Sequence, residues 1–263
     1  MSLLFNGLTA GTGNYVDAGS GAALDSLDSV TVIWWDYPNT VAAGNGRIFV
    51  KLEPGTNGLQ IWSANINAGS GRMFHIRTGG GAPVSSDIRM NTNTRQASAW
   101  NFNAISDSAA GGGKAYWGDL TTGVADVTLS ATGNGAEADH SAEPAGIGGA
   151  ADQTSLDGRI AMIWIYNRVL TIGEIRLHQW MPSTILSGCV LKHNYLSTLT
   201  LQDLSGNGNA GTLTNTPTLA VHVPLGPPFA RSFGWEGAFT AAAPGGAVVR
   251  DMVRSGFIPY ARS

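Results

Sequence analysis

The stretch Arg-Ile-Ala-Met-Ile-Trp-Ile-Tyr, residues 159–166, decides the fold class. Its isoleucine and aromatic side chains are typical of β-strands, and successive side chains of a strand point to opposite faces. This alternation would place Ile160, Met162, Trp164 and Tyr166 on one face and Ala161, Ile163 and Ile165 on the other. Because both faces would be apolar, the stretch predicts a central strand that is buried on both sides.

The residues after this strand predict one short helix near 171–181. Thr171 and Glu174 have the spacing of a capping box, in which the hydroxyl accepts from the third helical N–H and the carboxylate reaches back to the capping residue. Pro182 then ends the helix, since proline cannot continue it.

Short apolar runs recur along the preceding part of the chain. They cover 30–35, 47–52, 59–63, 72–77, 99–102, 114–117 and 124–129, and clusters of Gly, Asn, Asp or Ser separate them. Glycine makes up 36 of the 263 residues without a collagen-like period, which indicates many tight turns. Short strands punctuated by turn residues predict an all-β sandwich or barrel.

The composition argues against several function classes. Charged residues make up only 13% and the formal net charge is −3, so the chain lacks the basic surface that nucleic-acid binding needs. No apolar run reaches about 18 residues, which argues against a membrane-spanning helix. The first residues show no secretory signal, which predicts synthesis in the cytoplasm. The single cysteine, Cys189, is expected to be a small buried side chain.

The chain changes texture after Ser183, where a dense turn signal at 203–209 lies between shorter apolar runs. We predict one sandwich over 1–230, with a core at 5–182 and an edge-strand segment at 187–230, followed by a tail or arm at 231–263. The tail is too short to form its own core. We therefore expect it to contact other subunits, with these candidate residues: Trp235, Phe239, Arg250, Arg254, Phe257 and Tyr260.

Three patterns in the chain carry a family resemblance. They are Phe5-Asn6-Gly7 followed by Tyr15-Val16-Asp17-Ala18-Gly19, Trp100 followed by Ala115-Tyr116-Trp117-Gly118-Asp119, and the run from Ile147-Gly148-Gly149 through Leu156-Asp157-Gly158 to Asn167-Arg168-Val169-Leu170. Together they cover roughly residues 5–180 and resemble the laminin-G-like branch of the concanavalin A-like lectin and glucanase superfamily. The resemblance implies a concanavalin-like jelly-roll β-sandwich of two antiparallel sheets.

The segment 203–215 also resembles this family, but relatives carry such a stretch before the Phe-Asn-Gly strand instead of after the helix. The simplest explanation is a circular permutation, because sandwich termini often lie close together. The alternative is strand exchange, in which residues 190–213 complete a neighbouring subunit.

Catalysis is not expected. Glucanases of the superfamily carry closely spaced carboxylates on one strand, because retaining hydrolysis needs an acid and a nucleophile about 5 Å apart. The chain has no Glu-x-Asp-x-x-Glu run, and we expect Glu137, Asp139 and Glu143 to be solvated charges in a Gly/Ala-rich loop. We therefore predict that the protein is not an enzyme.

The sequence predicts no transition metal and no cofactor, since its five histidines lack zinc-site spacing and it has only one cysteine. Calcium stays open, because it binds scattered loop oxygens and laminin-G-like relatives often hold one at the sandwich rim. Asp119, Asp139 and Asp152 are weak candidates, with turn capping as the stronger alternative.

A candidate glycan- or partner-binding segment contains an aromatic residue that could stack on a sugar and polar residues that could bind its hydroxyls. Its members are Trp62, Asn65, Asn67, Arg72 and His75. The competing interpretation is that Trp62 is a core residue, as tryptophan in an alternating strand more often is.

Two functions from different classes remain. The first is a non-catalytic virion structural protein, a phage capsid decoration or fibre-type protein, which the resemblance to phage-encoded sequences and the low charge favour. It would act at the virion surface as a homo-oligomer, with a capsid or other virion protein as partner. The second is an extracellular carbohydrate-binding module that recognises surface glycans, which the superfamily alone implies. Neither involves nucleic acid or a membrane.

Overall fold

The structure is a computed structural model that describes residues 2–25, 27, 29–39, 46–52, 58–63, 73–77, 85–90, 96–108, 112–131, 143–195 and 201–224. Met1–Pro224 form one compact unit. The predicted tail at 231–263, with all of its candidate subunit contacts, lies outside the described residues. No helix in the described part of the chain is long and apolar enough to cross a membrane.

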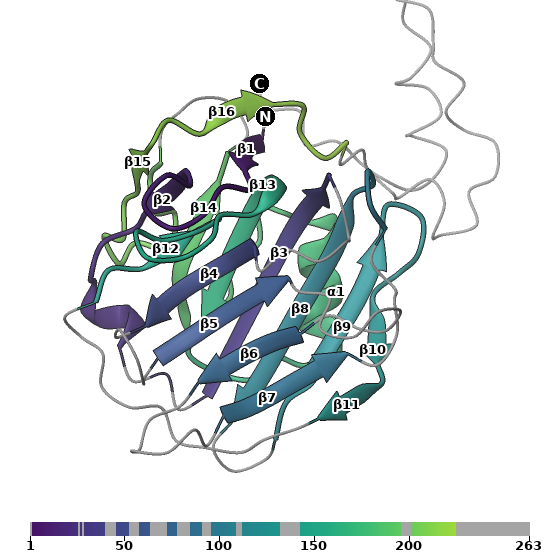
Figure 1. The fold of residues 1–263 in the computed structure, drawn as a ribbon. Helices are drawn as coiled ribbons and strands as arrows, with labels where there is room; N and C mark the ends of the chain where they lie inside the picture. Colours follow the sequence, from purple (N-terminus) through teal and green to yellow (C-terminus); the bar gives the residue numbers. More distant parts are fainter. Residues whose placement is uncertain are drawn as a thin grey trace, which may run out of the picture. The chain divides into compact units, whose positions relative to one another are not determined.

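Two antiparallel sheets pack face to face (Figure 1). The first contains, in order, β10 (Ala125–Val127), β9 (Lys114–Asp119), β8 (Asn101–Ser108), β3 (Ser29–Pro38), β13 (Asp157–Tyr166), β1 (Ser2–Asn6) and β16 (Thr218–Ala220), with β14 (Cys189–Asn194) also beside β13. The second contains β11 (Leu129–Ala131), β7 (Ser85–Met90), β6 (Met73–Arg77), β5 (Gly58–Ser63), β4 (Gly46–Leu52), β12 (Gly146–Ile147), β2 (Tyr15–Asp17) and β15 (Thr212–Thr214). The predicted all-β jelly-roll sandwich is therefore confirmed.

The core lies between the sheets and is built from alternate residues of the strands. The first sheet contributes Trp34 and Ile163, and the second contributes Phe49 and Ile61, none of them more than 1% exposed. The short turn η1 (Ala22–Leu24) closes one side of this core with Leu24. Since a buried aliphatic or aromatic side chain contributes about 1.5–3 kcal/mol, this layer stabilises the fold more than any polar contact does.

Strand β13 is buried on both faces, as predicted, but one of its residues lies on the other face. The register with β3 shifts between Ile160 and Met162, so the strict alternation breaks there. Ile160 consequently joins Ile163 and Ile165 in the core. Trp164 lies on the outer face, where its ring contacts His178. A β-bulge of this kind leaves no trace in the local pattern of apolar residues.

The helix α1 (Ile172–Trp180) covers part of the outer face of the first sheet (Figure 1). Its predicted capping box is present, with Thr171 as the capping residue and Glu174 as its partner. The Arg168 guanidinium holds both Glu174 oxygens at 2.6 and 3.2 Å and, together with the Thr171 hydrogen bonds, lowers the pKa of that carboxyl to about 2 against the opposing effect of burial. On the buried side, His178 accepts from the Tyr166 hydroxyl at 2.6 Å through Nε2, because its Nδ1 donates to the Glu174 carbonyl.

Acidification below about pH 6.5 should lower the free energy of unfolding. Burial lowers the pKa of His178, His193 and His222, because a charged imidazole loses its solvation inside the protein. At a pH between the lowered pKa of such a histidine in the folded protein and its pKa in the unfolded chain, the unfolded chain binds more protons than the folded protein does. The free energy of unfolding therefore falls as the pH falls. The slope is at most about 1.4 kcal/mol per pH unit for each histidine.

Urea unfolding measured between about pH 7.5 and 5.5 tests this dependence, since the carboxylates with lowered pKa values titrate at lower pH. The variant His178→Gln should show a shallower dependence than the wild type. A stability that stays constant across this window would contradict the prediction.

The last three strands pair with strands of the same chain. β14 and β1 lie end to end along one edge of β13, β15 pairs with β2, and β16 pairs with β1. The Ser2 hydroxyl donates to the Val221 carbonyl at 2.8 Å, so the start and the end of the compact unit lie side by side (Figure 1). These described strands therefore pair within one chain, as the permutation hypothesis expects, and the permutation itself stays a prediction.

Candidate functional site

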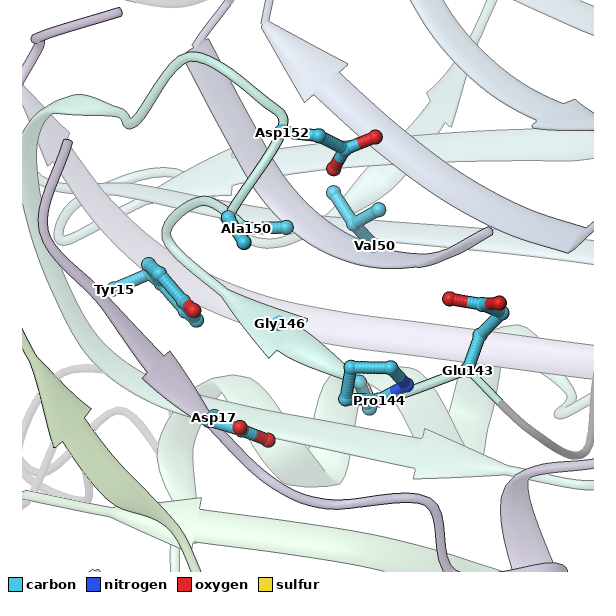
Figure 2. Close-up of a pocket in the computed structure, with 10 residues that line it drawn as sticks. Tyr15, Asp17, Val50, Glu143, Pro144, Gly146, Ala150 and Asp152 are labelled. Atoms are coloured by element: carbon cyan, nitrogen blue, oxygen red, sulfur yellow. The ribbon is translucent and has the colours of Figure 1, made fainter. Parts of the chain in front are cut away.

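A cavity of about 300 Å³ opens on the outer face of the second sheet. Strands β2, β12 and β4 form its floor, and the segments 143–145 and 150–152 form its walls (Figure 2). Tyr15 and Asp17 face it because Val16, between them, points into the core. Val50 faces it for the same reason, since Phe49 is a core residue.

Backbone hydrogen bonds fix both walls. The N–H of Ala18 donates to the Ala145 carbonyl and the N–H of Ala145 donates to the Gly19 carbonyl, each at 2.7 Å, which attaches one wall to the end of β2. The N–H of Gly11 donates to the Ala151 carbonyl at 2.9 Å, and this hydrogen bond holds the other wall, residues 150–152. The cavity is therefore held by ordered backbone and does not depend on side-chain positions alone.

A buried lysine binds the backbone of the cavity wall that residues 143–145 form. Lys51 is 1% exposed, and its ammonium donates to the Glu143 carbonyl at 2.7 Å and pairs with Asp25 at 2.9 Å. Breaking a buried charge pair is costly because it leaves a charge without compensation. Lys51 thus fixes the backbone from which the Glu143 side chain extends.

The polar groups of the cavity are hydrogen-bond acceptors for the most part. Asp17 accepts from the N–H of Gly19 at 2.8 Å, and Asp152 accepts from the Gln153 amide at 3.1 Å. The Glu143 carboxylate and the Tyr15 hydroxyl make no hydrogen bond to any described residue. Three carboxylates and no Lys, Arg or His line the cavity, so it favours ligands that donate hydrogen bonds and disfavours anions.

These carboxylates do not form a metal site. Among the described residues, no group of three or more His, Cys, Asp or Glu side chains could hold a metal ion. Asp119 ends β9 in the first sheet and accepts from both Thr121 and Thr122, which also lowers its pKa against the opposing effect of burial. It therefore caps a turn, whereas Asp152 lies at the cavity of the second sheet, and Asp139 lies outside the described residues. Of the three calcium candidates, the two that the structure describes, Asp119 and Asp152, therefore lie on different sheets and do not come together in one site.

The structure describes only part of the glycan-binding segment predicted from the sequence. Trp62 and His75 belong to β5 and β6, which are neighbours in the second sheet, but their side chains lie outside the described residues. Asn65, Asn67 and Arg72 also lie outside them. The cavity itself was not predicted from the sequence. Its signal was the alternation of Tyr15 and Asp17 about Val16, which puts an aromatic and an acid on the same outer face.

Comparisons with known proteins find no matching protein family and no matching curated protein. Among solved structures, a candidate carbohydrate-binding protein from Bacteroides ovatus is 14% identical with a TM-score of 0.52, over 84% of this chain and 59% of that one. The enzymatically active domain of tailspike protein 2 from bacteriophage CBA120 is 10% identical with a TM-score of 0.53, over 74% of this chain and 30% of that one. The chain thus spans little more than half of one structure and about a third of the other. At these identities the likeness shows the fold alone, which is a concanavalin-like jelly-roll β-sandwich.

Proposed function

We propose that the protein is a non-catalytic glycan-binding module that takes a neutral sugar in the cavity beside Tyr15. The cavity is the observation that carries this proposal. Its volume of about 300 Å³ lies at the low end for ligand pockets, which suits one or two sugar rings. The carbohydrate-binding description of the Bacteroides ovatus protein, which shares the fold, also supports it.

The lining matches the two kinds of surface that a sugar presents. Val50, Pro144 and Ala150 provide apolar walls for the C–H face of a pyranose ring. The carboxylates of Asp17 and Glu143 accept hydrogen bonds from its hydroxyls, and charge-assisted hydrogen bonds of this kind are about twice as strong as neutral ones. A sugar without its own negative charge avoids repulsion by these groups.

Binding without hydrolysis is part of the proposal. A glycosidase needs a general acid whose carboxyl group is kept protonated by an apolar environment. The cavity carboxylates are not enclosed in this way, because Asp152 is exposed and Asp17 and Glu143 are partly exposed. This environment favours recognition over proton transfer.

Replacing Glu143 by Gln should weaken binding of a neutral sugar about 10-fold or more, because one charge-assisted hydrogen bond contributes about 1.5–3 kcal/mol. The experiment is a calorimetric titration of the wild type and variant with members of a neutral mono- and disaccharide panel. Tyr15→Ala, which removes the aromatic wall, should weaken the same sugars.

Asp126→Asn provides a matched control, because Asp126 is an exposed acid on β10 of the other sheet and does not line the cavity. It should leave the affinity unchanged. The proposal is wrong if no neutral sugar binds, or if a bound sugar is indifferent to both Glu143→Gln and Tyr15→Ala.

A role in a virus particle is the second candidate, and the shared fold of the phage tailspike supports it over 74% of this chain. In that role the module would be a homo-oligomeric structural protein at the virion surface, attached to a capsid or other virion protein. Mass spectrometry of purified particles tests it directly. Stoichiometric recovery with particles would support this role, and complete absence from them would exclude it.

A further inference from the structure

The outer face of the first sheet carries a row of side chains at the end of β13 that lies away from α1. Arg159 pairs with Leu4 of β1 on one side and with Tyr37 of β3 on the other. These residues point outward, since their neighbours Leu3 and Phe5 are in the core. Trp100 continues the row beyond Tyr37, with their rings edge to face and the centroids 5.4 Å apart.

Arg159 in this row has unused hydrogen-bond donors. Its guanidinium lies 4.7 Å from the centroid of the Tyr37 ring, a cation–π contact that fixes its plane. Its Nε is buried without a hydrogen-bond partner, and the ion pairs among the described residues are Lys51–Asp25 and Arg168–Glu174, which leave Arg159 out. Other described arginines are paired, Arg168 with Glu174 and Arg47 with Gln153. A pre-oriented guanidinium on a partly exposed side chain is suited to a planar carboxylate, which its terminal Nη groups would bind because Nε is buried.

His222 adds an acceptor beside this donor. Its ring lies 6.5 Å from that of Trp100, measured between centroids. Its Nδ1 is 2.7 Å from the Val223 carbonyl, which can only accept, so Nδ1 carries the proton and Nε2 is left as an acceptor. Nε2 is buried and has no hydrogen-bond partner. The row therefore offers donors for a carboxylate and an acceptor for a hydroxyl.

We propose that this row, defined by Arg159, Tyr37, Trp100 and His222, is a second binding site, for a sugar carboxylate of the uronic acid type. Arg159 holds the carboxylate through its planar fork, and His222 accepts a hydroxyl of the same or the next sugar. Such a ligand would be repelled from the cavity of the second sheet, whose charged lining is entirely acidic. The two faces of the sandwich would then sort saccharides by charge.

Calorimetric titration with a glucuronic acid oligosaccharide and with the corresponding glucose oligosaccharide tests the site. Arg159→Gln should weaken uronate binding at least 10-fold and leave glucose binding unchanged. Arg159→Lys keeps the charge but loses the planar fork. Its affinity for the uronate should therefore lie between those of the wild type and Arg159→Gln. Lys114→Gln removes one exposed cation from β9 of the same sheet and should have no effect.

Several outcomes would overturn the proposal. They are an absence of uronate binding to the wild type, an equal loss in Lys114→Gln, and a preference for an acidic peptide over the uronate. The proposal would also be refuted if Glu143→Gln weakened uronate binding while Arg159→Gln left it unchanged. That result would show that the uronate binds in the cavity of the second sheet. Because Arg159→Lys tests the site without removing the charge, a folding defect in Arg159→Gln would not obscure the result.

Discussion

Truncation after Pro182 should abolish cooperative folding and cause aggregation. The deletion removes β14, β15 and β16, which pair with β13, β2 and β1 in both sheets. It also removes Val190, Leu191 and Tyr195, which are at most 5% exposed and belong to the core. Losing these three buried side chains at about 1.5–3 kcal/mol each removes a free energy comparable with the 5–15 kcal/mol by which a typical domain is stable, before the lost strand pairing is counted.

The deletion also uncovers the edge of β13 at residues 162–166, which are all buried. A long apolar edge with open N–H and C=O groups is a template for pairing with other chains. Size-exclusion chromatography and urea unfolding of the truncated chain measure both effects. A chain that ends at Pro224 is the matched control and should unfold in one transition, because Met1–Pro224 form one compact unit. A soluble, monomeric and cooperatively folding chain ending at Pro182 would contradict the expectation.

The fold was predictable where local sequence and tertiary environment agree. Residues 159–166 are apolar on both faces, and the strand is buried on both. The helix was expected near 171–181 and spans Ile172–Trp180, because a capping box and a following proline are local signals. The face of Ile160 was not predictable, since the bulge beside it depends on the register with β3.

The cavity was not predictable from spacing, because its lining comes from segments far apart in the chain. Tyr15 and Asp17 lie on β2, Val50 on β4, and Glu143 and Asp152 in later loops. Sheet pairing brings these segments together. The sequence predicted that Glu143 lies in a loop of solvated charges, whereas the Lys51 contact and the backbone hydrogen bonds of Ala145 hold this segment at the cavity.

Gly148→Ala should lower the free energy of unfolding by about 2–5 kcal/mol. Gly148 has φ +75°, a conformation that costs an L-residue roughly 1–2 kcal/mol. An added Cβ would also overlap the ring of Phe5, which is 1% exposed and fixed in the core. Overpacking of this kind costs about 1–3 kcal/mol more. Urea unfolding of the variant at neutral pH measures the sum.

Gly11→Ala separates the backbone contribution from the steric one. Gly11 has a similar φ of +80°, but an added Cβ would meet nothing within 4 Å. This control should therefore lose only the roughly 1–2 kcal/mol of conformational cost. Gly148→Ala should then be more destabilised than Gly11→Ala, because only its added Cβ overlaps Phe5. Replacing Phe5 by Leu in the Gly148→Ala variant should recover part of that difference, since the smaller side chain frees space. Equal losses in the two glycine variants would mean that the chain around Gly148 relaxes freely, which would refute a rigid contact between β1 and the turn after β12.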